Sequence, residues 1–259
     1  MTASPRRSFL HLRDTVAVLV WRDQKSRYKS TAMGIVWAVA GPLLFLMTFY
    51  VLFKVVLPLE IPNYAAHLFI GIVVWTWFQG ATSEAVTSIV SNPGLVAQPG
   101  FPVAALPFAV TTSHLVTMLL TLPILMAILL SGGSAMGSSL LALPVVTAGL
   151  FVFVLAVGYL VAALNVAFRD MQYIVPILLQ LGYFTTPIFY DARTLPDTTH
   201  LILSFNPMMQ FVEAYRAVLM RAEWPYWPGL IVTIAASALL LGATREVFRR
   251  ASFRFLEEL

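Results

Sequence analysis

The chain has 259 residues, of which 59% are hydrophobic and only 11% are charged. A soluble domain typically carries about 25% charged residues, so this composition excludes an ordinary water-exposed surface. The chain contains no cysteine, which excludes a disulfide framework, a thiolate metal site and a cysteine nucleophile. The net charge is +4, and many of the basic residues precede the first apolar run. Basic residues next to a membrane span usually set its orientation, so they indicate membrane topology more than nucleic-acid binding.

The N-terminal segment 1–33 is predicted to contain an amphipathic helix. Its apolar positions fall on one helical face and its polar positions lie away from that face. The apolar set is Phe9, Leu12, Val16, Leu19 and Val20, and the polar set is His11, Asp14 and Arg22. Leu10, Val18 and Trp21 widen the apolar face. Two interpretations stay open: a helix that lies on the cytoplasmic membrane surface, or one that is buried against another subunit.

Six apolar runs long enough to approach or cross a bilayer follow the amphipathic segment. They cover residues 34–57, 64–91, 106–130, 140–168, 174–189 and 227–247. Proline- and glycine-rich breakers separate several of them, and the short gaps predict antiparallel neighbours. The predicted fold is an all-α integral membrane protein with six transmembrane helices. We treat residues 1–259 as one domain, with a cytoplasmic or interfacial segment 1–33, a membrane region 34–249 and a cytoplasmic tail 250–259.

The segment 191–226 between the fifth and sixth runs is too polar to span a bilayer and too apolar for a free loop. It contains Glu213 and Arg216, whose i,i+3 spacing predicts an ion pair on one helix face. We predict two short re-entrant helices here, because backbone at membrane depth must be buried in protein or line a cavity. An ordinary extracellular hairpin is the alternative.

The basic residues predict the orientation of the chain. With both termini on one side, that side holds twelve of the sixteen lysines and arginines, including Arg169 and the seven before residue 34. The positive-inside rule therefore predicts that both termini are cytoplasmic.

The motifs of a self-contained enzyme are missing from the sequence. None of the three lysines follows a glycine, so a phosphate-binding loop for ATP cannot be formed. The four histidines are scattered and no nucleophile elbow is present. We therefore predict that the chain is not itself an enzyme and binds no cofactor or metal.

Polar and aromatic side chains within the spans are the candidates for function. Glu84 and His114 lie toward the cytoplasmic ends of the second and third spans and are predicted to meet, for which a structural contact is favoured over transport chemistry. Aromatic and amide groups suit a weakly bound glycan, although membrane belts and core packing use the same residues. The glycan-passage candidates are Trp75, Trp77, Phe78, Gln79, Gln180, Tyr183, Phe184 and Tyr190.

Motifs along nearly the whole chain resemble one family. They are Arg22-Asp23-Gln24-Lys25-Ser26-Arg27-Tyr28-Lys29, Gly34-Ile35-Val36-Trp37, Phe101-Pro102, Leu106-Pro107, Phe168-Arg169-Asp170, Thr186-Pro187-Ile188-Phe189-Tyr190 and Asn206-Pro207. Their order and spacing resemble the ABC-2 type permeases that export O-antigen, capsule and teichoic acid. The resemblance implies a homodimer, two copies of a separate ATPase subunit that carries ATP and Mg²⁺, and a lipid-linked glycan substrate in the bacterial inner membrane.

The resemblance also implies roles for residues at the cytoplasmic side. The candidates for coupling to the ATPase are Arg13, Asn92, Gln98, Arg169 and Asp170. The loop 92–100 departs from the family because it lacks basic residues, which shifts the expected contact toward Arg13, Arg22 and Arg169. The candidates for binding a lipid pyrophosphate are Arg22, Lys25, Arg27 and Lys29, although topology and attraction to anionic lipids require the same cations.

The predicted function is export of lipid-linked polysaccharide, such as the O-antigen of lipopolysaccharide, powered by the separate ATPase. A drug or lipid efflux permease of the same superfamily is the nearest alternative. A secondary transporter would need ion-coupling residues at mid-membrane depth, which are scarce. A membrane-embedded enzyme would need clustered acids or histidines at one interface, and these are sparse as well.

Overall fold

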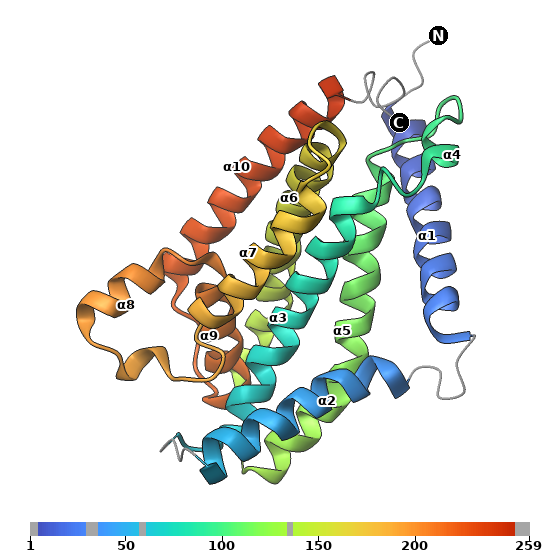
Figure 1. Cartoon of the computed structure of the whole chain (residues 1–259). Coiled ribbons are helices and arrows are strands. Elements are labelled where there is room, and N and C mark those ends of the chain that lie inside the picture. The colour runs from blue at the N-terminus through green and yellow to red at the C-terminus, as the bar shows by residue number, and fades with distance from the viewer. Residues whose placement is uncertain (1–4, 30–35, 57–60, 134–136, 252–259) are drawn as a thin grey trace.

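A computed structural model describes residues 5–29, 36–56, 61–133 and 137–251. All regular elements within these ranges are helices (Figure 1). The longer ones are α1 (Pro5–Lys29), α2 (Val36–Tyr50), α3 (Tyr64–Thr87), α5 (Ala105–Ser131), α6 (Leu143–Ala167), α7 (Met171–Thr185), α9 (Pro207–Met220) and α10 (Trp227–Ala251). Short elements are η1 (Val51–Val56), α4 (Pro93–Val96), η2 (Ser138–Ala142), η3 (Ala192–Thr194) and α8 (Asp197–Ser204).

The helix α3 is the centre of the bundle. It packs against α2, α5, α6, α7 and α9, and most of its side chains are buried. An ordinary surface helix buries one stripe, whereas a helix that is apolar on all sides is expected inside a bundle. The core of the protein is therefore built around α3.

Three segments in the described part of the chain are long and apolar enough to cross a membrane. They are Ala105–Ser131, Ser138–Ala167 and Trp227–Phe248. The other three predicted crossings correspond to α2 with η1, to α3 and to α7. The helix α3 is long, but it carries His67, Gln79 and Glu84, and α7 has only 15 residues. The predicted all-helical class is confirmed, and the number of crossings stays a prediction.

The fifth predicted span is shorter in the structure than the apolar run suggested. The run was expected to continue to residue 189, but α7 ends at Thr185. Thr186 adopts an extended conformation (φ −89°, ψ 136°) directly before Pro187. A proline disfavours helical backbone at the residue before it, so the chain leaves the helix here although the following residues are apolar.

The first predicted span is also divided. Its α-helical part contains Pro42, and the last six described residues form a π-helix, Val51–Val56. The predicted limits at residues 34 and 57 lie outside the described residues. Such wide turns are uncommon and are found mostly as short pieces within α-helices.

The amphipathic helix α1 packs along α5 of the same chain (Figure 1). Val16 and Leu19 are buried in a cluster that also contains Leu106 and Ala109. Val18 and Trp21, which widen the apolar face, stay exposed. The centre of the predicted apolar face is thus satisfied within the subunit, and its edge remains available.

The chain has no cysteine, so single cysteines can report the orientation of the bundle. Gln98 and Ser138 are both exposed, next to α4 and in η2. We expect a membrane-impermeant maleimide added to intact cells to label Ser138→Cys and to label Gln98→Cys only after permeabilisation. Labelling of Gln98→Cys in intact cells would reverse the orientation predicted from the basic residues.

Candidate functional site

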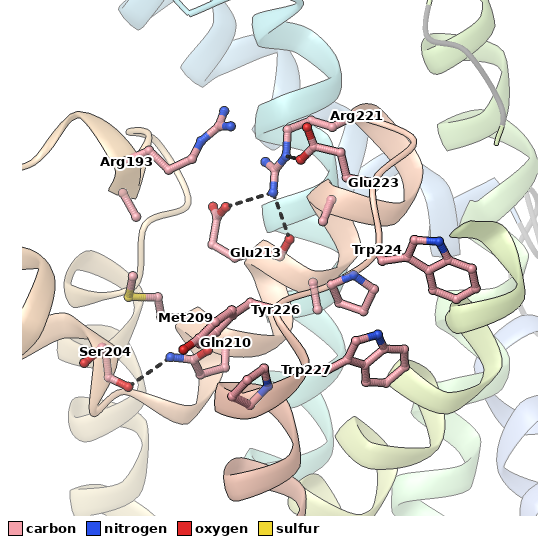
Figure 2. Close-up of a pocket in the computed structure, with 15 residues that line it drawn as sticks. Arg193, Ser204, Met209, Gln210, Glu213, Arg221, Glu223, Trp224, Tyr226 and Trp227 are labelled. Carbon is pink, nitrogen blue, oxygen red and sulfur yellow. Dashed lines mark hydrogen bonds and ion pairs between the residues drawn. The ribbon is translucent and has the colours of Figure 1, made fainter. Parts of the chain in front are cut away.

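A cavity of about 700 Å³ lies between α9, the segment 221–226 and the start of α10 (Figure 2). Two ion pairs, Arg221 with Glu213 and with Glu223, lie at one side of it. Trp224 and Trp227 line another side, with ring centroids 6.4 Å apart. The cavity is therefore both polar and aromatic.

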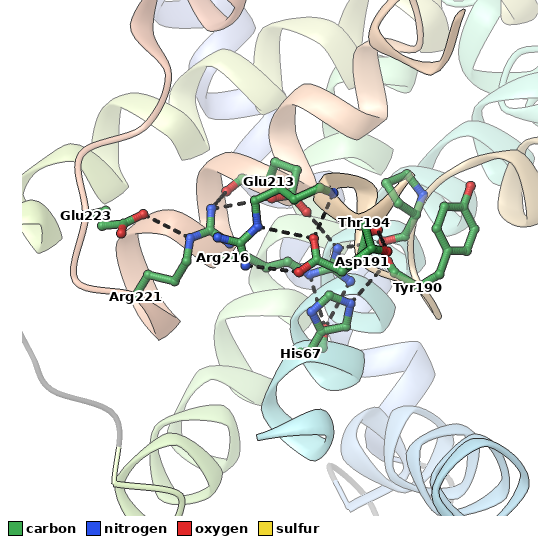
Figure 3. A network of polar contacts seen from close by, with 10 residues as sticks. His67, Tyr190, Asp191, Thr194, Glu213, Arg216, Arg221 and Glu223 are labelled. Atoms are coloured by element: carbon green, nitrogen blue, oxygen red, sulfur yellow. Dashed lines mark hydrogen bonds and ion pairs between the residues drawn. The ribbon is translucent and has the colours of Figure 1, made fainter. Parts of the chain in front are cut away.

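A buried arginine, Arg216 of α9, lies at the centre of a polar network (Figure 3). Its side chain has no exposed surface. Nη1 donates to the Glu213 carboxylate at 2.9 Å, which confirms the ion pair predicted from the i,i+3 spacing. The remaining bonds go to backbone carbonyls: Nη1 to Pro187 at 2.6 Å, Nη2 to Ile188 at 3.0 Å, and Nε and Nη2 to His67 at 3.3 and 3.1 Å.

Arg216 thereby joins three parts of the chain. Its partners lie in α9, in the first turns of α3, and in the irregular segment after α7. Buried carbonyl groups without a partner are costly, and the segment 186–190 has no helical ladder to supply one. The guanidinium, which carries five N–H donors, satisfies these carbonyls and allows the chain to stay irregular inside the bundle.

Additional hydrogen bonds hold the same segment from both sides. The Tyr64 hydroxyl donates to the Phe189 carbonyl at 3.2 Å, and a ring nitrogen of His67 lies 3.3 Å from the Tyr190 carbonyl. The Asn206 amide donates to the Thr186 hydroxyl at 2.9 Å. The predicted pair of short helices after this segment exists as α8 and α9, whereas their re-entry into the membrane stays a prediction.

Gly71 of α3 makes room for this arrangement. A Cβ atom at Gly71 would lie 3.1 Å from Ile188 Cγ2, 3.2 Å from the Ile188 Cα atom and 3.2 Å from Arg216 Nη2. The backbone of Ile188 cannot move away as a flexible side chain would. A glycine is therefore needed for the close approach of α3 to this segment.

A second ion pair next to the network involves Asp191 and Arg193. Arg193 Nη2 lies 3.0 Å from Asp191 Oδ2, and the Asp191 carboxyl also caps the backbone N–H of residue 193. Burial alone would raise the pKa of Asp191, but the hydrogen bonds and charge of Arg193 lower it overall. The pair thus contributes stability above the ordinary aspartate pKa, and this contribution is lost as the pH falls through the lowered value.

At the other end of the bundle, three side chains connect α1 to α3 and α5. Arg27 Nη2 forms an ion pair with Glu84, and His114 Nε2 lies 2.8 Å from the same carboxylate oxygen. The expected meeting of Glu84 and His114 is confirmed. The participation of Arg27, which is 57 residues away from Glu84, was missed. Gln24 adds a bond to the Ser113 carbonyl at 2.9 Å, so the C-terminal half of α1 is fixed by polar contacts.

Arg27 also binds Asp23 one turn earlier, with Nε 2.8 Å from Oδ2. Partial burial lowers the pKa of the guanidinium, but the hydrogen bonds and charges of Asp23 and Glu84 raise it overall above its ordinary value. Arg27 therefore stays charged, and its guanidinium is paired with Asp23 and Glu84. It has less freedom to bind a lipid pyrophosphate than was assumed from the sequence.

The other pyrophosphate candidates differ from Arg27. Arg22 and Lys25 are exposed on α1, and the Lys25 ammonium lies 4.3 Å from the ring centroid of Trp21. The side chain of Lys29 lies outside the described residues. The role itself stays a prediction, with Arg22 and Lys25 as its accessible members.

The coupling candidates lie on α1 and in two connections, one between α3 and α5 and one between α6 and α7. Arg13 is exposed on α1 and pairs with Asp14 at 2.8 Å. Asn92 caps the turn after α3 by donating to the Ser88 carbonyl at 2.9 Å, and Gln98 is exposed after α4. Arg169 and Asp170 are exposed in the turn between α6 and α7. Their arrangement leaves these groups accessible, and their role stays a prediction.

The passage candidates divide into buried and accessible groups. Trp75, Trp77 and Phe78 are buried within the chain. Trp75 donates to Gln79 at 3.0 Å and packs on Gly182, where a Cβ atom would meet its ring at 3.0 Å. These three side chains already have packing partners inside one subunit.

The accessible candidates lie on α3, on α7 and in the segment that follows α7. Gln79, Gln180 and Phe184 are exposed, and Tyr183 and Tyr190 are partly buried. A row of phenylalanines on α2 and η1, absent from the sequence-based set, joins them. The ring centroids of Phe45, Phe49 and Phe53 follow one another at 6.2 Å, and the Phe49 and Phe189 centroids lie 4.5 Å apart. Their i,i+4 spacing is the signal that would have identified this row.

The apolar helices and the buried polar connections define a multi-pass membrane protein. A family model described as ABC-2 type transporter matches residues 15–220, so the chain belongs to the ABC-2 type transporter family. The resemblance noted in the sequence is thereby confirmed.

Curated relatives match almost the whole chain. An O-antigen export system permease protein, RfbA, of Myxococcus xanthus is 31% identical over 255 residues, covering 98% of both chains. A protein of the same name from Klebsiella pneumoniae is 29% identical and covers 95% of both. The polysialic acid transport protein KpsM of Escherichia coli is 22% identical, with 80% of this chain and 81% of the relative covered.

Replacing Arg216 tests the structural role of the buried network. We expect Arg216→Met to reduce the free energy of unfolding by about 3 kcal/mol, because it leaves Glu213 and several carbonyls without their donor. Thermal unfolding in detergent, followed by tryptophan fluorescence, measures the effect. The matched control is Arg13→Met, which removes an exposed pair and is expected to change stability by less than about 1 kcal/mol. Equal unfolding temperatures for the two variants would contradict the structural role assigned to Arg216.

Proposed function

We propose that this chain is the membrane subunit of an ABC exporter of polysaccharide. The observation that carries the proposal is the similarity over 98% of the chain to a permease named for O-antigen export, together with the similarity over 80% of the chain to a protein named for polysialic acid transport. The absence of a phosphate-binding loop from the sequence supports a division of labour in which a separate subunit binds ATP and Mg²⁺. The substrate is a glycan attached to a lipid carrier, taken from the inner leaflet of the bacterial inner membrane.

A second copy of the chain completes the passage in this proposal. The helix α7 buries only Val175 and Leu179, whereas Ile177, Leu181 and Phe184 on it are exposed. The neighbouring α2 exposes an apolar row as well, in which Leu44 and Met47 lie three residues apart on one helix face. Two subunits that meet at these faces enclose a surface with Gln79, Gln180 and the phenylalanines of α2 and η1. Such a surface offers C–H contacts and amide hydrogen bonds without fixed charge, which suits a sliding sugar chain.

The connection to the ATPase runs through α1 in this proposal. Both termini are cytoplasmic, and the six crossings bring α1, α4 and the α6–α7 turn to the ATPase side. Arg27 links α1 to Glu84 of α3, the helix that contacts α2, α5, α6, α7 and α9. A displacement of α1 by the ATPase is therefore passed directly to the helix in the centre of the bundle.

Coexpression with the ATPase subunit that is encoded beside this chain tests the proposed export function. We expect a complex of two permeases and two ATPases that moves lipid-linked polysaccharide into proteoliposomes when ATP is present. ATP hydrolysis should change on addition of the glycan and should not respond to small hydrophobic drugs. Transport of drugs by the same complex would favour an efflux permease, and transport by the permease alone would favour a secondary transporter.

A double-mutant cycle at Arg27 and Glu84 tests the proposed coupling. We expect Arg27→Ala and Glu84→Ala each to lower ATP-driven export about fivefold to tenfold, and the double variant to be no worse than either, because all three variants break the same contact between α1 and α3. ATP hydrolysis by the complex should fall less than export. The control is Ser26→Ala, at an exposed neighbouring position. Independent, multiplying losses would show that the two residues do not act together.

A further inference from the structure

The cavity beside α9 has a rigid rim. The helix α9 ends in a left-handed residue, Ala222, with φ 54°. The Glu223 N–H donates to the Ala217 carbonyl at 2.9 Å and the Arg221 N–H to the Arg216 carbonyl at 3.2 Å, so residues that follow the helix bond two of its last carbonyls. This turn brings the segment 223–226 back over α9. Left-handed alanine is unfavourable and persists where the surroundings fix the chain.

The charged side chains that line the cavity are compensated. Arg221 lies 3.1 Å from Glu223 and 3.4 Å from Glu213, and Arg193 lies 3.0 Å from Asp191. These pairs include all four charged members of the described lining. A phosphate or pyrophosphate group needs cations that are not already neutralised. The cavity therefore favours a neutral polar ligand.

The remaining walls offer aromatic surface and hydrogen-bonding groups. The rings of Trp224 and Trp227 are tilted by 36°, and 53% of Trp224 and 73% of Tyr226 are exposed. On the opposite wall the Gln210 amide donates to the Ser204 carbonyl at 3.2 Å and keeps a second N–H available. A Cβ atom at Gly229 would lie 2.7 Å from Gln210 Oε1, so this glycine leaves the space that the amide occupies.

Aromatic faces, an amide and paired charges around about 700 Å³ match the chemistry of a sugar ring, which is apolar on its C–H faces and polar at its hydroxyls. We propose that this cavity is a saccharide-binding site that holds neutral sugar residues of the exported glycan on the outer side of the membrane. The inference rests on the proposed function. It assigns α9 and the start of α10 to contact with the glycan outside the passage itself.

Protection of a single cysteine tests the site in the reconstituted permease–ATPase complex. Pro228 is exposed and lines the cavity, so Pro228→Cys reports occupancy without removing an aromatic or charged group. The probe is the oligosaccharide released by mild acid from the surface polysaccharide of the source cells. We expect it to slow maleimide labelling of Pro228→Cys at least threefold and to leave the control Ser138→Cys unchanged. Inorganic pyrophosphate should protect neither.

Substitutions of Trp224 test whether protection of Pro228→Cys depends on the aromatic wall of the cavity. In the Pro228→Cys background, Trp224→Ala should weaken oligosaccharide binding about fivefold, whereas Trp224→Phe should keep it within about twofold. Gly229→Ala should weaken it as well, because the new methyl group displaces Gln210. Unchanged labelling with oligosaccharide, or protection by pyrophosphate, would overturn the proposed site.

ATP-driven export by the unaltered complex, measured in the same preparations, separates the two proposals. Export without protection refutes the saccharide site and leaves the exporter function standing. Protection without export supports the site and refutes the exporter function.

Discussion

The guanidinium of Arg216 allows the helical bundle to contain an irregular segment. A membrane protein must satisfy its backbone groups internally, and the residues that follow α7 leave the helix before Pro187. Arg216 donates hydrogen bonds to the carbonyls of Pro187, Ile188 and His67, while Glu213 balances its charge. Pro187 ends the helix and Gly71 permits the close approach of α3, and Arg216 then connects the irregular segment to α3 and α9.

The two polar clusters divide the molecule by function. The Arg216 network is buried, bonded mainly to backbone and suited to fixing a shape. The Arg27–Glu84–His114 cluster joins side chains of three different helices and is only partly buried, so its contacts can be exchanged. In the proposed mechanism the ATPase moves α1. Contacts that can be exchanged near α1 and fixed contacts near α9 are then the expected arrangement. This contrast supports the proposed direction of coupling.

Local spacing and helix periodicity were sufficient for part of the structure. The pair Glu213–Arg216 follows from an i,i+3 spacing, and the meeting of Glu84 with His114 follows from two antiparallel spans. Arg27 was assigned to a lipid headgroup because nothing in the sequence relates it to a residue 57 positions away. The burial of Trp77 could not be predicted from the sequence either. The helix α3 is apolar on nearly all sides, so no stripe distinguishes a core face from a passage face. The end of α7 was missed although Pro187 signalled it, since the apolar run continues beyond the helix.

In the proposed topology, in which α7 is one of six crossings, the shortness of α7 has a consequence for the surrounding lipid. Fifteen residues of α-helix extend about 22 Å, less than the roughly 30 Å of hydrocarbon in a typical bilayer. The remaining depth falls to the segment 186–190, whose polar backbone is covered by α3 and α9. Such a hydrophobic mismatch is relieved by local thinning of the bilayer or by tilting of neighbouring helices. The energy of the α7 face therefore depends on membrane thickness, and a thicker, more ordered bilayer penalises any state that exposes this face to lipid.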